Sequence, residues 1–177
     1  MKSESFDLQP VLDGTLIRLR PLSTDDFEAL YRCASDPLIW EQHPEPTRYQ
    51  EEVFQVFFDG AIQSKGAFAV IERSKNVVIG TSRYYSLAPE RREVTVGYTF
   101  LTREYWGGRF NFELKKLMLE HAFQYVDVVS FEIGEANLRS RTAIERIGAR
   151  LAELRSFDGN PHVIYKIEKK SFAEAFR

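Results

Sequence analysis

Two adjacent glycines, Gly107 and Gly108, stand directly before an amphipathic helical pattern, between Arg103 and Arg109. The first N–H groups of a helix have no partner within the helix, and the helix dipole adds partial positive charge there. Glycines let a phosphate approach this backbone closely, and arginines add charge-assisted contacts. The stretch therefore predicts an anion site. The alternative is a tight turn in which the glycines only supply positive φ.

Other phosphate and hydrolase signatures are absent from the sequence. There is no G-x-x-x-x-G-K-[ST] loop, no G-x-G-x-x-G after a strand, no HExxH and no G-x-S-x-G elbow. The single cysteine, Cys33, excludes an intrachain disulfide and a four-cysteine zinc site, and we expect no metal. The anion site therefore indicates a phosphate-bearing ligand held by backbone amides.

Composition indicates one globular domain over residues 1–177. The chain is 44% hydrophobic and 28% charged, and its net charge of −2 gives no reason to expect a nucleic-acid or membrane partner. The N-terminal stretch lacks an apolar signal region, and no apolar run is long enough for a membrane span. We expect a reducing, cytoplasmic compartment.

Hydrophobic periodicity predicts a mixed α/β order. The expected elements are a strand at 15–22, helices at 23–37 and 47–66, strands at 67–72, 77–87 and 92–101, a helix after Gly108, a strand at 128–133, a helix at 138–148, and a hairpin of 150–157 with 162–168. Thr47 and Gln50 have the spacing of a capping box. Gly148 is the expected C-cap, and DGNP the hairpin turn.

Three motifs at matching spacings carry a family resemblance. The run VGYTFLTREYWGGRFNFELKKLMLEHAF, then FEIGEANLRSRTAIERIGARL, and the opening LRPLSTDDFEAL resemble the GNAT N-acetyltransferases. The nearest branch contains the ribosomal-protein alanine and serine N-terminal acetyltransferases. The resemblance covers about residues 12–168 and implies a GNAT α/β fold: a central twisted, mostly antiparallel sheet, splayed at the cofactor site and flanked by helices.

The resemblance implies transfer of an acetyl group from acetyl-CoA to a primary amine by direct attack in a ternary complex. The amine would belong to a protein N-terminus or a small molecule. The alternative is a non-catalytic CoA-binding or protein-interaction module with the same fold. The two final strands could pair across a homodimer.

The resemblance also implies where the cofactor would bind. The pyrophosphate would lie on backbone N–H groups from about Gly107 to Phe112, and the pantetheine arm along the strand edge 98–101. A backbone N–H near Tyr98 would polarise the thioester carbonyl. The predicted cofactor-binding residues are Thr99, Phe100, Leu101, Arg103, Trp106, Gly107, Gly108, Arg109, Phe110, Asn111, Asn137 and Ser140.

One position departs from the family pattern. Arg109 stands where the family loop usually has a small residue. Either Gly108 compensates, or Arg109 points outward and leaves its backbone N–H available.

Asn137 and Ser140 match family positions that contact the cofactor arm and protonate the departing thiolate. Asn137 also suits the N-cap of the helix that follows it, and Ser140 is also an ordinary first-turn serine. Both roles of Asn137 are compatible.

A general base would help an acceptor amine that is mostly protonated near neutral pH. Glu93 is the candidate, because it is in phase with Thr95 and Gly97 on the strand that enters the site. The family more often has its carboxylate at the position of Thr95. The alternative for Glu93 is an exposed strand residue.

The loop 38–46 would line the acceptor pocket in this family. It contains Trp40, Glu41 and His43, of which Glu41 could attract a cationic amine and His43 could bind the acceptor or act as a second base. Tyr84, with Tyr85, is expected to add pocket wall near a strand end. A surface histidine beside a proline turn is the alternative for His43.

Overall fold

A computed structural model describes residues 5–175, so the ends of the predicted domain, 1–4 and 176–177, lie outside the described residues. The helices and strands follow the predicted order, with a two-residue strand β1, short 3-10 turns and a final helix α5 in addition. The elements are β1 (Leu12–Asp13), β2 (Ile17–Pro21), η1 (Thr24–Asp26), α1 (Phe27–Ala34), η2 (Pro37–Ile39), α2 (Glu51–Ser64), β3 (Ala67–Glu72), β4 (Val77–Ala88), η3 (Pro89–Arg91), β5 (Glu93–Leu101), η4 (Arg103–Tyr105), α3 (Arg109–Ala122), β6 (Val128–Gly134), α4 (Leu138–Arg146), β7 (Arg150–Phe157), β8 (Asn160–Glu168) and α5 (Lys169–Ala175).

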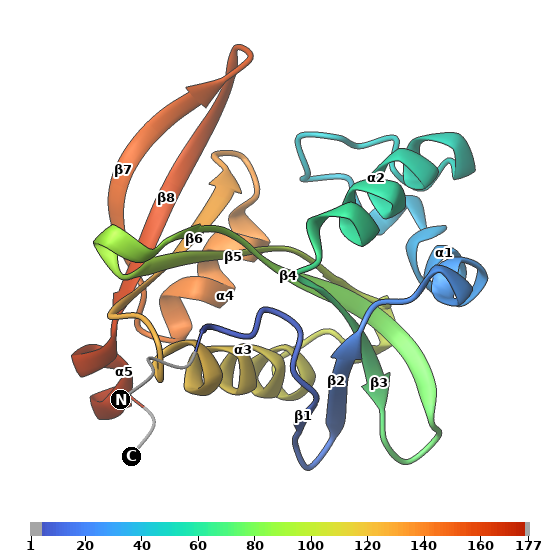
Figure 1. The fold of residues 1–177 in the computed structure, drawn as a ribbon. Helices are drawn as coiled ribbons and strands as arrows, with labels where there is room; N and C mark the ends of the chain where they lie inside the picture. The colour runs from blue at the N-terminus through green and yellow to red at the C-terminus, as the bar shows by residue number, and fades with distance from the viewer. Residues whose placement is uncertain (1–4, 176–177) are drawn as a thin grey trace.

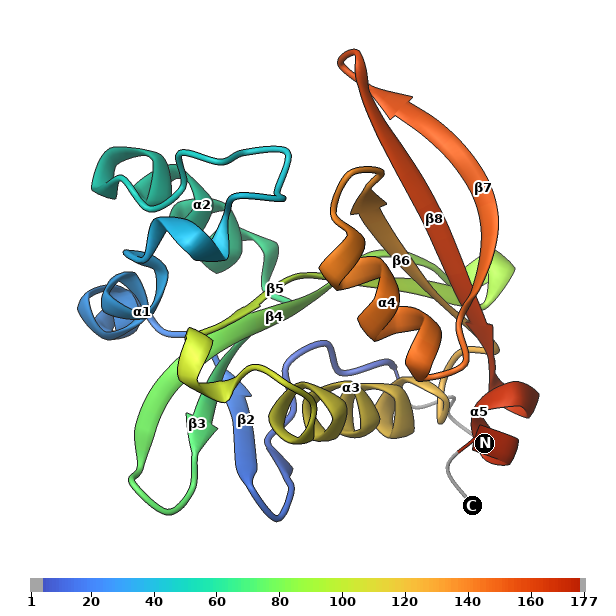
Figure 2. The same ribbon diagram turned by 180° about the vertical axis from the view of Figure 1, so that it is seen from behind.

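All eight strands join one sheet in the order β1-β2-β3-β4-β5-β6-β8-β7. Every neighbouring pair is antiparallel except β5 and β6, which are parallel. Parallel neighbours need a long crossover, and α3 supplies it. Figure 1 shows α1 and α2 on one face and α3 on the other, with the β7–β8 hairpin rising away from both, and Figure 2 shows α4 beside α3 from behind. The predicted fold class is confirmed.

The two faces of the sheet carry separate cores. Leu114 and Met118 of α3 pack with Phe68 and Val70 of β3 on one side. Phe54 of α2 packs on the other side, and complete burial of such a ring contributes about 2–3 kcal/mol. Because β3 is buried on both faces, its sequence is apolar throughout rather than alternating.

The first two predicted helices differ in how their N-termini are capped. Ser23 caps the first helical turn, with Asp26 accepting a hydrogen bond from the Ser23 N–H at 2.8 Å. The capping box predicted for α2 is wrong: the helix begins at Glu51 with no side-chain cap. The Thr47 hydroxyl instead donates to the Glu45 carboxylate.

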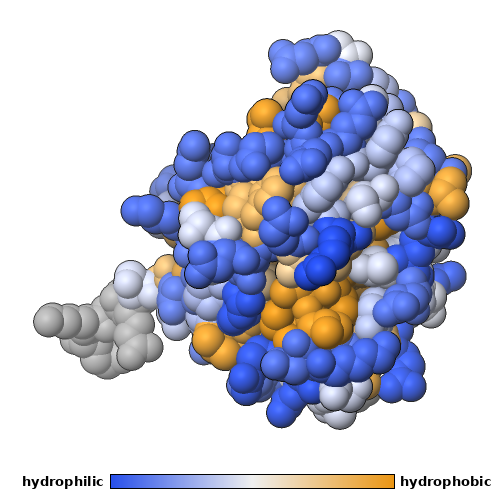
Figure 3. All heavy atoms as spheres, turned by 90° about the vertical axis from the view of Figure 1, so that its right-hand side faces the viewer, coloured by the Kyte–Doolittle hydropathy of each residue, from blue (hydrophilic) through white to orange (hydrophobic). Residues whose placement is uncertain are grey.

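The surface is mixed in polarity. Figure 3 faces the side that carries α1, α2 and β3, where apolar atoms are framed by hydrophilic side chains. Within residues 5–175, no helix combines the length and apolarity needed to cross a bilayer.

Candidate active site

The sheet opens between β5 and β6. The two strands pair only at Glu93–Val128, Val94–Val129 and Thr95–Ser130, and the remaining residues of each continue without the other. After Thr95, the β5 residues Val96, Gly97, Phe100 and Leu101 still pair with β4 on the opposite edge. The predicted splay is therefore present, and it leaves one edge of β5 available to an extended ligand.

A bulge in β5 lies beside this opening. Arg83 pairs with Gly97 and Thr81 with Phe100, so Tyr98 and Thr99 have no partners in β4. Tyr98 has a φ of 53°, in the left-handed region. Such a conformation costs about 1–3 kcal/mol in a non-glycine residue and persists where its surroundings enforce it, which is common at functional sites. The bulge leaves backbone polar groups of Tyr98 and Thr99 outside the β4–β5 ladder.

The two glycines form the start of α3. Gly107 has a φ of 91° and Gly108, the N-cap, a φ of 132°. The first backbone bond of the helix runs from the Phe112 N–H to the Gly108 carbonyl at 2.8 Å. Among residues 5–175, no hydrogen bond is recorded for the N–H groups of 107–111. The glycines therefore supply positive φ and also leave a row of unpartnered donors.

The resemblance makes acetyl-CoA the expected ligand of these donors, and Gly108→Ala should then weaken its binding by roughly 10- to 100-fold, since alanine disfavours this conformation by a few kcal/mol. A Cβ on Gly108 would meet nothing within 4 Å, so the cost is conformational rather than steric. Isothermal titration gives the Kd. Gly159→Ala is the control: it has a φ of 80°, equally open space, and a place at the β7–β8 turn. An equal loss in both variants would contradict a local effect.

The other predicted residues near this helix start have defined places. Arg109 is exposed at the first helical position, and Phe110 packs edge-on against Tyr105 at 4.8 Å. The Trp106 indole donates to the Leu101 carbonyl at 2.9 Å. Arg103 is held by Asp36 in an ion pair, so it reaches a phosphate only if that pair opens.

The two cores hold the side chains of Phe100 and Leu101, each less than a tenth exposed. These residues can therefore face a ligand only through their backbone, as the prediction requires. Asn111 is half-buried in the first turn of α3.

The start of α4 matches the capping interpretation of Asn137. Its side-chain oxygen accepts the Ser140 N–H at 3.2 Å. The Ser140 side chain is half-buried, and no hydrogen bond of its hydroxyl is recorded among residues 5–175. The hydroxyl thus remains available to a ligand.

Glu93 lies at the closed end of the β5–β6 pair. Its carboxylate accepts from the Ser130 hydroxyl and from Lys166 at 2.9 Å. Burial alone would raise its pKa, but these hydrogen bonds hold the pKa below its usual value. A carboxylate that accepts from two donors is a weak base. Glu93 also lies where β5 and β6 are still paired, before the strands separate.

A second carboxylate, Glu132, lies past the last β5–β6 pair. It follows Ser130 by two residues, so it projects from the same face as Thr95, which pairs with Ser130. Among the described residues no hydrogen bond or ion pair engages it. Burial raises the pKa of Tyr85 well above its usual value, and the nearby charge of Glu132 raises it further. Tyr85 contacts the Tyr98 ring at 5.1 Å, so Glu132 lies close to the bulge.

The predicted acceptor residues fall into different environments. Trp40 is 3% exposed and donates to the Ala34 carbonyl at 2.8 Å, so it belongs to the core. Glu41 is exposed and lies 3.7 Å from Arg139. Burial, with nearby Arg48, lowers the pKa of His43 to about 3, so its neutral ring is a poor base at pH 7.

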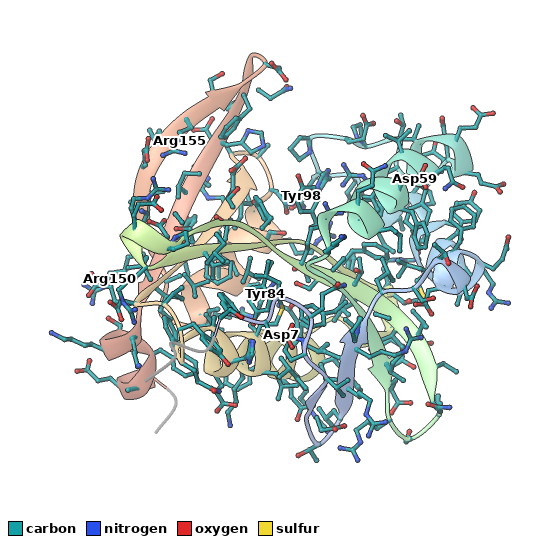
Figure 4. The ribbon with its side chains drawn as sticks, in the orientation of Figure 1. Asp7, Asp59, Tyr84, Tyr98, Arg150 and Arg155 are labelled. Atoms are coloured by element: carbon teal, nitrogen blue, oxygen red, sulfur yellow. The ribbon has the colours of Figure 1, made fainter. Side chains whose placement is uncertain are left out.

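The prediction for Tyr84 is wrong. Its side chain is 1% exposed, lies on the α3 face, and donates to the Met118 carbonyl. Figure 4 shows Tyr84 below the sheet and Tyr98 above it. Strand parity puts the neighbouring Tyr85 on the open face, where its ring covers Gly97.

A buried cation that the sequence reasoning missed lies under the bulge. Lys115 of α3 is 4% exposed and donates to the Thr99 hydroxyl at 2.6 Å, which contacts Ser82 at 2.7 Å. No ion pair is recorded for Lys115 within residues 5–175. Burial lowers its pKa to about 7. The sequence held a signal for this burial. Lys115 follows Leu114 directly and precedes Met118 by three residues, so helical spacing places it at the apolar face of α3.

A splayed sheet beside a helix start with unpartnered donors defines a class of protein that binds an extended, phosphate-bearing ligand between two strands. Residues 17–150 match the family profile described as the Acetyltransferase (GNAT) domain. The chain therefore belongs to the GNAT acetyltransferase family, which uses acetyl-CoA as donor. Among curated protein sequences, none gives a significant match.

Solved structures support the same fold. A GCN5-related N-acetyltransferase from Brucella melitensis has a TM-score of 0.80 at 19% identity, over 93% of this chain and 81% of that one. Mycobacterium smegmatis RimJ in complex with CoA-disulfide has 0.69 at 17% identity, over 90% and 87%. The ribosomal-protein-S5-alanine acetyltransferase from Vibrio fischeri has 0.69 at 13% identity, over 93% and 99%.

Proposed function

We propose that this enzyme transfers the acetyl group of acetyl-CoA to a primary amine, on a protein N-terminus or a small molecule, by direct attack in a ternary complex. The observation that carries the proposal is that β5 parts from β6 and that the next α-helix, α3, begins with the unpartnered N–H groups of 107–111. Backbone donors and positive-φ glycines fit a pyrophosphate, and the free edge of β5 fits an amide-bearing arm. Residues 98–101 would hold that arm.

The chemistry needs a proton acceptor and a proton donor. The acceptor nitrogen bonds to the acetyl carbon, the carbon–sulfur bond breaks, and the amine loses a proton. A backbone N–H of Tyr98 or Thr99 would stabilise the charge that develops on the carbonyl oxygen. Ser140, whose hydroxyl is available, would return a proton to the sulfur.

The base in this proposal is Glu132 rather than Glu93. Glu132 lies where the strands have parted and has no recorded partner among residues 5–175, whereas Glu93 is held by Ser130 and Lys166. A base must be within reach of the amine and unengaged.

Titration with acetyl-CoA, followed by assay of free thiol, tests the function. We expect acetyl-CoA to raise the Tm, as a ligand that binds only the folded state must, and some primary amine to accelerate thiol release above hydrolysis. Binding without amine-dependent thiol release, across small amines and peptide N-termini, would instead favour the non-catalytic CoA-binding module. Absence of binding would contradict both.

The homodimer also stays a prediction. Its physical basis is that β7 is an edge strand whose residues are all exposed, with Leu154 67% exposed. Exposed apolar edge strands favour pairing with a second chain.

A further inference from the structure

A cavity of about 510 Å³ opens between α2 and the β5 bulge. Phe57 and Val56 of α2 line one side, and Tyr98 lines the other. Arg48 and Arg83 also line it, from the loop before α2 and from β4. This volume suits a group of amino-acid size. The cavity reaches the proposed reaction centre because Tyr98 belongs to both.

Arg83 enters this cavity without a counter-ion. It is 7% exposed, and its guanidinium lies 4.0 Å from the centre of the Tyr98 ring and 5.7 Å from that of Phe57. Its one recorded hydrogen bond goes to the Gly60 carbonyl at 3.3 Å. Its Nε has no partner among residues 5–175, and no carboxylate there lies within ion-pair distance.

Arg48 also lies at this cavity without an ion pair among the described residues. Its guanidinium lies over Phe57 at 4.7 Å and over Trp40 at 5.1 Å, and its buried Nε has no partner in the described chain. Burial lowers its pKa to about 10. Such a desolvated cation is costly unless something compensates its charge.

The recorded contact of Arg48 does not satisfy it. Its Nη1 lies 3.2 Å from His43 Nε2. His43 Nδ1 accepts the Glu45 N–H at 3.0 Å, so the neutral ring must carry its proton on Nε2. Two donors then face each other. Arg48 thus lacks an acceptor there as well.

The acids at the cavity do not pair with the arginines, although the charge of Glu45 offsets part of the burial effect on the pKa of Arg48. Glu45 and Glu52 both line it. The Glu45 carboxylate is bonded to Thr47, and Glu52 is exposed. Neither forms an ion pair with either arginine in the described structure. Ring contacts alone would explain one packed arginine, but they do not explain two arginines without an ion pair in the described structure that repel each other at one opening.

We propose that the acceptor amine carries a carboxylate that binds between Arg48 and Arg83. Planar guanidinium groups match carboxylates through paired hydrogen bonds. The carboxylate would pair with guanidinium N–H groups of both arginines and leave the amine near Tyr98 and Glu132. This specificity rests on the proposed function, and the carboxylate could belong to a small amino acid or to a peptide side chain.

Matched acceptors test the specificity. One arm compares 4-aminobutyrate with 4-aminobutyramide, and the other compares short peptides beginning Met-Glu and Met-Gln. We expect kcat/KM to favour the carboxylate member by at least about 10-fold in one arm, which also identifies the source of the carboxylate. Arg48→Gln and Arg83→Gln should remove this preference by raising KM for that member alone. No preference in either arm, or a preference that survives both substitutions, overturns the proposal.

Arg18→Gln is the matched control. Arg18 is an exposed arginine of β2 that pairs with Asp13 at 2.6 Å, outside the cavity. The Arg18→Gln variant should leave the KM for the carboxylate acceptor and the KM for its amide counterpart unchanged. Arg48→Lys and Arg83→Lys keep the charge, so a partial return of the preference separates anion binding from a folding defect, which unfolding curves also report.

Glutarate, which has no amine, separates the two proposals. At constant ionic strength it should raise the Tm of the wild-type protein and not of Arg48→Gln or Arg83→Gln. If it does so while no amine is acetylated, the carboxylate site stands and the proposed function fails. If uncharged amines are acetylated and glutarate has no effect, the function stands and the carboxylate site is refuted.

Discussion

Glu132→Gln should reduce kcat by about 100- to 10,000-fold with little change in acetyl-CoA affinity, because a positioned general base contributes on this scale. Steady-state kinetics with saturating acetyl-CoA measures kcat, and isothermal titration measures the acetyl-CoA affinity.

Glu93→Gln is the matched control, since it makes the same change on the adjacent strand. It should leave kcat within a few-fold and lower the stability instead. The pKa of Glu93 is lowered in the folded state, so its stabilisation is present above the unfolded pKa and is lost as the pH falls through the folded one. A larger loss of kcat in Glu93→Gln than in Glu132→Gln would return the base to Glu93.

Lys115→Met should stabilise the protein, by about 2 kcal/mol near pH 6. Burial lowers the pKa of Lys115 from 10.5 to about 7, so folding disfavours its charged form. Below pH 7 the folded protein bears the whole cost of the buried charge. Between about pH 7 and pH 10 the unfolded chain binds more protons than the folded one, so wild-type stability rises relative to the variant. The advantage of methionine should therefore shrink across this window.

Denaturant unfolding of the variant at several pH values measures this effect. Thr99 keeps its contact with Ser82 in the variant, which limits the loss from the missing hydrogen bond. Lys116→Met is the control, since Lys116 is partly exposed and 3.8 Å from Glu120, and it should change stability by less than about 0.5 kcal/mol. If Lys115→Met instead lowers the stability of the protein at low pH, the charged Lys115 amine has a favourable partner in the folded state and the prediction is wrong.

Local features of the site could be predicted from the chain alone. The double glycine and the Asn137 cap depend on residues within a few positions of each other, and both conformations are as expected. Glycine is the residue that adopts positive φ at little cost, and asparagine caps helices by its own side chain. The position of Arg109 is also local, because the first helical residue can point outward and still present its N–H.

Features that depend on strand pairing could not be predicted. Tyr84 and Tyr85 are adjacent, and two register shifts between β4 and β5 bracket the segment in which one faces α3 and the other the open site. A shift of one residue exchanges the two faces, so tyrosine content alone does not decide which side is used. The same applies to Glu93 and Glu132, since only the parallel register shows where the strands separate.

The sequence by itself determined the family, the order of elements and the glycine-bearing helix start, because these follow from residue types at short, regular spacing. Only the tertiary structure decided which carboxylate is unengaged, that Lys115 is buried under Thr99, and that Arg48 and Arg83 line the same cavity. These relations join residues far apart in the chain, and their energies come from burial and missing partners. Both quantities exist only once the sheet and helices have packed.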